Sequence, residues 1–367
     1  MKCVNCGKDS NYKDRSGKKC PACGQAFAFE PKDGDAVTDM MFKNAIAAVS
    51  GEGRIRWGVE HLYYEVCRRK MNSKRAPLGC VLASLCVFTF CVTMLCGVRH
   101  KNAAFLFPVA FFSFIFLLVT SASRVRKRFV PIEKEAFNRY WTRWTNVMGK
   151  PAGVIERAVD NTPVEPLEED IADYSFDRAV ICDRARTVDL LVANNFHFEN
   201  NCAVLSFDGY PKGVFGTIRK MLKKNPKLQV FVLHDATPGG CALAQKLITD
   251  PHWFGGSGLR VIDLGLRPRH AKPFKGLYLR GVGAKPTDEP GVTPQEADWL
   301  YKHTLELAAC RPEQVLKRLF AGLMAHANDD PRAADSGGAV MTCGAFDAGG
   351  YGGDAAAAAE GGSDAFG

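Results

Sequence analysis

Apolar and charged positions divide the chain into regions of different character. Residues 36–75 place apolar side chains at helical spacing, and residues 76–98 and 102–123 contain no charged residue. Between residues 176 and 328, short apolar runs alternate with segments of helical periodicity. This alternation predicts an α/β domain with a doubly wound parallel sheet, within a multidomain chain.

The two charge-free stretches, 76–98 and 102–123, predict a two-helix transmembrane hairpin. About 20 mostly apolar residues cross a bilayer, and soluble helices of that length usually carry a polar stripe. Basic residues flank both outer ends of the hairpin: Arg68, Arg69, Lys70, Lys74 and Arg75, then Arg124, Arg126, Lys127 and Arg128. The positive-inside rule then places both termini in the cytoplasm, and we expect an integral protein of the inner or plasma membrane.

The segments around the hairpin have distinct compositions. Residues 36–75 are expected to form a helical juxtamembrane segment, and residues 124–150 a juxtamembrane amphipathic helix. The aromatic residues of that helix would lie along the membrane surface or pack against the downstream domain. Residues 160–175 form an acidic linker, and the Gly- and Ala-rich residues 331–367 predict a disordered tail.

Residues 1–30 contain two Cys-x-x-Cys pairs, Cys3 with Cys6 and Cys20 with Cys23. This spacing is typical of a zinc ribbon, in which four thiolates complete a tetrahedral Zn²⁺ site. Because protein ligands fill every position, the zinc would be structural. Zinc ribbons contact nucleic acid or protein, and lysines and Arg15 between the pairs predict a basic surface; a solvated capping module is the alternative.

Four short motifs follow one another between residues 176 and 270. They are the run that ends at Asp183, then Asp208-Gly209-Tyr210-Pro211, Asp235-Ala236-Thr237-Pro238-Gly239-Gly240, and Leu264-Gly265-Leu266-Arg267-Pro268. In this order they resemble the Toprim domain of the topoisomerase VI A subunit and its meiotic double-strand-break relatives. The resemblance implies an acidic cluster that holds Mg²⁺ and acts on phosphodiester bonds.

The acidic cluster departs from the pattern that the resemblance implies. Asp183 stands in place of a Glu, and Thr237 in place of the second Asp of the third motif. Asp183 and Asp235 are the candidate catalytic residues, and Asp208 could add a third carboxylate to a Mg²⁺ site. Alternatively, Asp183 caps the next helix and Asp235 stabilises its turn. His234 is expected to be a buried histidine.

The formal net charge is +9, and one basic run lies within the α/β domain. Its members recur at helical spacing: Arg219, Lys220, Lys223, Lys224 and Lys227. Such a stripe is typical of a surface that follows the phosphates of a nucleic acid, although a solvated helix face has the same pattern.

These patterns leave three functions open. The first is a membrane-anchored, cytoplasm-facing protein whose zinc ribbon and degenerate Toprim-like domain bind nucleic acid or a protein partner without catalysis. The second is a membrane-tethered, Mg²⁺-dependent nuclease acting through Asp183 and Asp235. The third is a membrane scaffold with no nucleic-acid role. The lost second Asp favours the first, and the sequence gives no indication of the oligomeric state.

Overall fold

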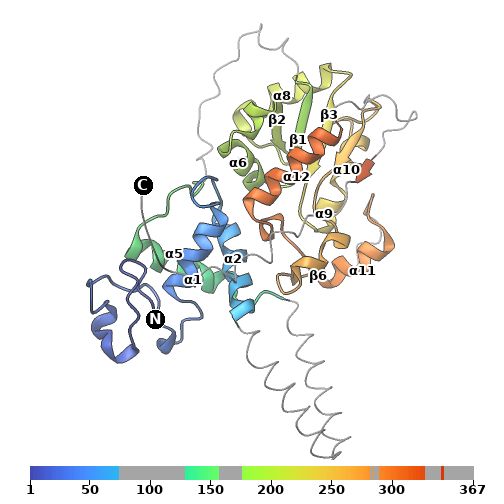
Figure 1. Cartoon of the computed structure of the whole chain (residues 1–367). Helices are drawn as coiled ribbons and strands as arrows, with labels where there is room; N and C mark the ends of the chain where they lie inside the picture. Colours follow the sequence, from blue (N-terminus) through green and yellow to red (C-terminus); the bar gives the residue numbers. More distant parts are fainter. Residues whose placement is uncertain (74–128, 157–175, 282, 284–288, 327–339, 343–367) are drawn as a thin grey trace, which may run out of the picture.

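Figure 1 shows the computed structural model of the chain, which describes residues 1–73, 129–156, 176–281, 283, 289–326 and 340–342. Within these ranges, no helix combines the length and apolar composition that a membrane span needs. The predicted hairpin at 76–98 and 102–123 and the acidic linker at 160–175 lie outside the described residues.

A parallel sheet forms the centre of the α/β domain. Its strands lie in the order β2 (Cys202–Ser206), β1 (Arg178–Cys182), β3 (Gln229–Leu233), β4 (Val261–Asp263) and β7 (Val340–Thr342). At its carboxyl end, β1 places Cys182 between Ser206 of β2 and Leu233 of β3. The chain order therefore reverses at β1, and the crevice between β1 and β3 is the topological switch point where such sheets bind ligands.

Helices follow the strands and cover both faces of the sheet (Figure 1). They are α6 (Ala185–Ala193), α7 (Phe196–Glu199), α8 (Lys212–Lys224), α9 (Pro238–Cys241), α10 (Leu243–Thr249), α11 (Pro294–Lys302) and α12 (Pro312–Ala325). An antiparallel pair, β5 (Leu279–Arg280) and β6 (His303–Thr304), lies outside the main sheet. Short 3-10 turns complete the domain: η6 (Pro268–His270), η7 (Lys272–Phe274) and η8 (Leu307–Ala309).

Alternate residues of each strand enter different hydrophobic cores, as expected for a sheet buried on both faces. Val180 and Phe231 join one core, together with Leu319 of α12. Ile181 and Val232 join the other, on the opposite face. The near-continuous apolar runs in these strands therefore reflect burial on both sides.

The amino-terminal module consists of the cysteine-containing segment and three helices, α1 (Asp39–Val49), α2 (Val59–Ser73) and α5 (Lys134–Met148). Three 3-10 turns, η1 (Tyr12–Asp14), η2 (Ser16–Lys18) and η3 (Pro31–Asp33), precede them. Figure 1 shows the three helices grouped to one side of the sheet. Helices α1 and α2 thus occupy the stretch 36–75 that the sequence predicts to be helical.

Helix α5 buries the aromatic face that the sequence analysis assigned to the membrane surface or the downstream domain. Trp144 packs on Phe42 with ring centroids 4.9 Å apart, and Phe137 packs on Tyr63 at 5.3 Å. Phe137 and Trp144 are both buried. The membrane surface does not cover these two side chains, which belong to the same hydrophobic core as residues of the downstream domain. The sequence left both possibilities open because an apolar helix face has the same periodicity whether lipid or protein covers it.

Charged contacts connect α2 to the α/β domain. Glu65 of α2 is buried and accepts hydrogen bonds from Arg311 at 3.2 Å, and it also pairs with Arg68 and Arg69. Arg68 in turn donates to the carbonyl of Ala309 at 2.6 Å. The helix that leads toward the first predicted span is therefore bound to the sheet domain.

One strand lies within the predicted disordered tail, residues 331–367. Val340–Thr342 form β7, which pairs in parallel with β4. For these three residues the prediction of disorder was wrong, because Val, Met and Thr form a short β-favouring run inside a Gly- and Ala-rich segment. The other residues of the segment lie outside the described part of the chain.

Candidate functional site

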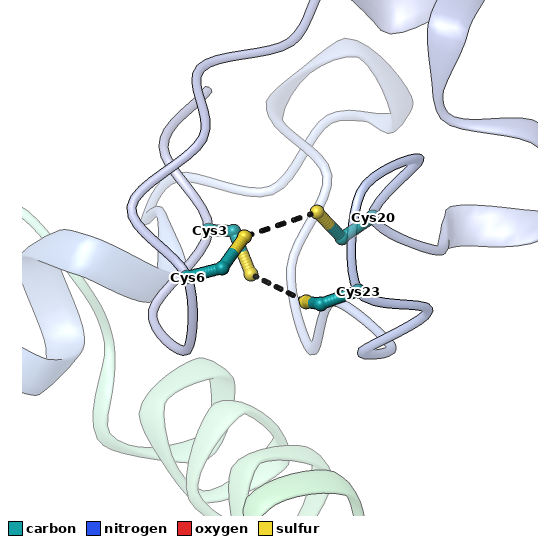
Figure 2. A group of neighbouring side chains, drawn as sticks. All are labelled: Cys3, Cys6, Cys20 and Cys23. Carbon is teal, nitrogen blue, oxygen red and sulfur yellow. Dashed lines mark hydrogen bonds between the residues drawn. The ribbon is translucent and has the colours of Figure 1, made fainter.

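Four cysteines from two loops form a cluster near the amino terminus. Figure 2 shows the sulfurs of Cys3, Cys6, Cys20 and Cys23 gathered together. The four sulfurs all lie within 4.8 Å of one another, with Cys3 3.7 Å from Cys23 and Cys6 3.6 Å from Cys20. A tetrahedral zinc with Zn–S bonds of about 2.3 Å would hold its sulfurs roughly 3.8 Å apart. The cluster could hold a metal such as zinc.

The two cysteine loops repeat one backbone arrangement. The backbone carbonyl of Cys3 accepts a hydrogen bond from Gly7 N, and the carbonyl of Cys20 accepts one from Gly24 N. Gly7 and Gly24 have φ of 73° and 71°, a left-handed conformation that favours glycine. Backbone hydrogen bonds from Ala22 and Cys23 lower the pKa of the Cys20 thiol to about 7, which favours the thiolate that binds metal. A backbone hydrogen bond from Lys8 also lowers the pKa of Cys6, but burial and the other three cysteines together raise it to about 11.

The surface between the cysteine pairs is less basic than expected. Arg15 is buried, and its Nη2 lies 2.8 Å from Glu30 Oε2. Lys18 pairs with Asp33 at 2.8 Å. Both cations are therefore neutralised within the module. The sequence did not predict this, because it does not show which charged residues have an acidic partner in the fold.

Asp183 and Asp235 lie side by side at the switch point of the sheet. Asp183 directly follows β1, and Asp235 follows the neighbouring strand β3. The backbone N–H of Asp235 donates to Asp183 Oδ2 at 2.8 Å, whereas Asp183 Oδ1 is buried without a hydrogen-bond partner. The structure therefore brings together the two residues that the sequence analysis selected.

Arg184 and Glu306 lie beside this carboxylate pair, and neither role was predicted from the sequence. Arg184 Nε lies 2.6 Å from Asp235 Oδ2, and Arg184 Nη1 donates to Glu306 Oε1 at 3.3 Å. Leu305 pairs through its backbone with Ala236, just after the end of β3. This pairing places Leu307 N 2.6 Å from Asp235 Oδ1, to which it donates a hydrogen bond. Glu306 is far from the motifs in sequence and has no local pattern that would indicate its position.

Burial and charge shift the pKa values of these acids in different directions. Burial raises the pKa of Asp183, and burial together with Asp183 raises the pKa of Asp235 to about 8 despite Arg184. Burial alone would also raise the pKa of Glu306, but Lys134 and Arg184 hold it below its usual value. The pair Asp183 and Asp235 therefore retains a proton near neutral pH.

A cleft of about 770 Å³ lies between the amino-terminal module and this edge of the sheet. Its charged lining residues are Glu60, Lys134, Asp183, Arg184, Arg186, Asp189 and Asp208. Asp208 is exposed at the turn after β2. Asp235 does not line the cleft and is only 2% exposed, so it lies beneath the surface that Asp183 and Asp208 share.

The three candidate Mg²⁺ ligands do not form a compact group. Across the described residues, the four cysteines are the one set of at least three Cys, His, Asp or Glu side chains close enough to share an ion. Asp183, Asp208 and Asp235 are not a second such set. Thr237 uses its hydroxyl to accept the N–H of Gly240 at 3.1 Å and so caps α9.

A second buried polar network lies beside the carboxylate pair. The ring nitrogens of His234 face two acceptors, Asp235 O at 2.7 Å and Asp263 Oδ1 at 2.9 Å. Burial alone would lower the pKa of His234, but Asp263 raises it, which favours the protonated ring. Arg267 Nε donates to Asp263 Oδ2 at 2.7 Å. A Cβ at Gly265 would lie 2.2 Å from the His234 ring, which explains the glycine in the fourth motif. His234 is buried, as predicted.

The predicted basic run lies on and just after helix α8. Lys220, Lys223, Lys224 and Lys227 are exposed, and Arg219 lies over the Phe215 ring at 5.3 Å. Helix α8 runs antiparallel to the strands. Its last turn therefore lies at the amino-terminal ends of the strands, whereas the carboxylate pair lies at their carboxyl-terminal ends. Figure 1 shows α8 on the far side of the sheet from α2 and α5.

Comparisons with family models, curated proteins and solved structures found no match. The resemblance to Toprim domains therefore remains a prediction from the four motifs. The class of protein that the structure defines is an α/β-sheet protein with an amino-terminal four-cysteine cluster.

Proposed function

We propose that this protein is anchored in a membrane, faces the cytoplasm and binds nucleic acid through helix α8 without cleaving it. The α/β domain would be a degenerate Toprim domain, and residues 1–30 a zinc ribbon that is structural. The charge-free stretches 76–98 and 102–123 would form the anchor. This arrangement would hold nucleic acid, or a complex that contains it, close to the membrane.

The observation that carries the proposal is the uncompensated charge of Arg219, Lys220 and Lys227, on and just after α8. Among the described residues, Arg219, Lys220 and Lys227 have no carboxylate partner, and Lys223 donates to the carbonyl of Pro251 at 2.8 Å. Elsewhere, by contrast, Arg15, Lys134 and Arg267 all pair with acids. Unpaired lysines and arginines on one face are the electrostatic feature that binds phosphates.

The position of α8 supports nucleic acid over anionic lipid as the partner. Helix α2 ends at Ser73, three residues before the first predicted span, and α5 begins after the second. Figure 1 places α8 on the opposite side of the sheet from both helices. A basic face directed away from the membrane-proximal helices would meet soluble polyanions.

The enclosure of Asp235 supports the absence of catalysis. Its Oδ1 accepts the N–H of Leu307, and its side chain lies beneath the cleft. Its Oδ2 is buried 2.6 Å from Arg184 Nε, as an ion pair without hydrogen-bond geometry. A carboxylate in this position does not line the cleft where a Mg²⁺ ion would have to meet a phosphate. Thr237 likewise uses its oxygen within the protein.

A Mg²⁺-dependent nuclease acting through Asp183 and Asp235 is the second candidate. It is favoured by the unpartnered, buried Oδ1 of Asp183, which lies at the edge of the cleft, and by the raised pKa values of both acids. Perturbed titratable groups in a cleft are typical of functional sites.

A cleavage assay distinguishes the two candidates. We expect the full chain, purified in detergent, to leave single- and double-stranded DNA and RNA intact with Mg²⁺ or Mn²⁺. The Thr237→Asp variant, which restores the missing acid, and Asp235→Asn serve as comparison. Metal-dependent cleavage by the wild-type protein that Asp235→Asn abolishes would establish the nuclease and refute the non-catalytic proposal.

A further inference from the structure

The residues at the carboxylate pair do not fit the divalent metal that the Toprim resemblance implies. Asp235 is 2% exposed, and Arg184 Nε lies 2.6 Å from its Oδ2. Its other oxygen accepts the N–H of Leu307 at 2.6 Å. A metal bound by Asp235 would have to displace a guanidinium group that already supplies positive charge there.

Arg184 belongs to a network of polar contacts that also includes Glu306. Its Nη1 also donates to Glu306 Oε1 at 3.3 Å, so the guanidinium connects the two acids. Glu306 is itself held by Lys134 Nζ at 2.8 Å and by the hydroxyl of Tyr64 at 2.9 Å. A guanidinium that contacts two buried carboxylates is fixed in direction as well as charge.

We propose that Arg184 is an internal counter-cation that replaces a divalent metal at the Asp183–Asp235 pair, and that Glu306 is the positioning residue that holds Arg184 there. This inference rests on the proposal that the protein does not cleave nucleic acid, and it gives a physical reason for the absence of cleavage. The pair keeps the position of an acidic metal site, while its positive charge comes from the residue that directly follows Asp183.

The same contacts connect the site to the membrane-proximal helices. Tyr64 belongs to α2, which leads toward the first predicted span, and Lys134 begins α5, which follows the second. Both donate to Glu306. Glu306 is therefore in contact with both of these helices as well as with Arg184.

Metal binding by the full chain in detergent tests the proposal. Mn²⁺ and Mg²⁺ are titrated by calorimetry, and thermal unfolding is followed with and without metal. We expect no wild-type binding that depends on Asp235. Arg184→Met removes the charge but keeps an unbranched side chain at this position, and the variant should bind Mn²⁺ at least about tenfold more tightly than wild type, with an increase in Tm on adding metal. Glu306→Gln should shift affinity in the same direction by less.

Three controls make the assignment specific. Arg184→Lys retains the charge but cannot contact both acids through a guanidinium, so it should gain less metal binding than Arg184→Met. Arg186→Met removes a cation from the same helix that lies 3.8 Å from Glu60 and should gain no metal binding. Adding Asp235→Asn to Arg184→Met should abolish the gain.

Wild-type binding of Mn²⁺ that Asp235→Asn removes would overturn the inference, as would an Arg184→Met protein that folds but gains no metal binding. If Arg184→Met does not fold, the wild-type and Asp235→Asn titrations decide alone: Asp235-dependent binding overturns the inference and its absence supports it. Metal binding without cleavage would refute only this inference. Loss of nucleic-acid binding is measured separately and bears only on the proposed function.

Discussion

The triple variant Lys220→Glu, Lys223→Glu, Lys227→Glu is expected to bind nucleic acid on the order of 10²-fold more weakly than wild type at about 100 mM salt, or not at all. Each lysine that contacts a phosphate releases a condensed counterion, and each glutamate would repel the phosphate instead. The slope of log affinity against log salt should also become shallower by about one for each lost contact. Fluorescence anisotropy with labelled DNA and RNA measures both quantities.

The matched control changes the net charge equally on another surface. Lys272, Lys275 and Lys302 are exposed residues outside α8. Replacing all three by Glu should reduce affinity far less, because only long-range repulsion acts there and salt screens it beyond about 10 Å. Equal losses in the two triple variants would show that overall charge, and not the α8 surface, determines binding. Circular dichroism confirms that both variants fold.

Cys20→Ser is expected to abolish metal binding at the amino terminus and to unfold the cysteine loops within residues 1–30. The core around the cysteine loops is small, consisting of Cys3, Cys20 and Phe27 with Met1 packed against them. Ala28 and Phe29 belong to the large core, so the loss of structure should be confined to the cysteine loops that precede them. Structural zinc supplies on the order of 10 kcal/mol or more of apparent binding free energy to modules of this kind. Wild-type protein should therefore contain about one zinc per chain by elemental analysis.

Limited proteolysis provides the second readout for the cysteine cluster. Cleavage within residues 1–30 should become rapid in Cys20→Ser and in chelator-treated wild type. Cys202→Ala, a buried cysteine of β2 outside the cluster, should keep its metal. Full zinc content in Cys20→Ser, or a protease-resistant segment without metal, would contradict a structural zinc site.

The sequence predicted those features whose determinants are local. The four cysteines form two short pairs, and the turns after them bring the pairs together. Asp183 and Asp235 could be placed because each follows an apolar strand, and adjacent parallel strands bring their carboxyl ends to one edge. The basic residues of α8 likewise follow from helical spacing and exposure.

Features that depend on distant contacts were not predictable. Glu306 reaches the carboxylate pair because the chain at Leu305 pairs with Ala236, and no motif surrounds it. The aromatic face of α5 has the same spacing whether it meets lipid or Phe42. Arg15 and Arg219 are both arginines near other cations, yet Arg15 is neutralised by Glu30 and Arg219 is not paired with an acid in the described part of the chain.

The most direct test of nucleic-acid binding by α8 is a salt titration of the wild-type full chain with a short labelled duplex. With about four phosphate contacts, log affinity should fall with log salt at a slope of roughly −3 to −4, so that affinity decreases on the order of 10²-fold between about 50 and 200 mM salt. An absence of binding at the lowest salt, or binding that salt does not weaken, would contradict the proposal.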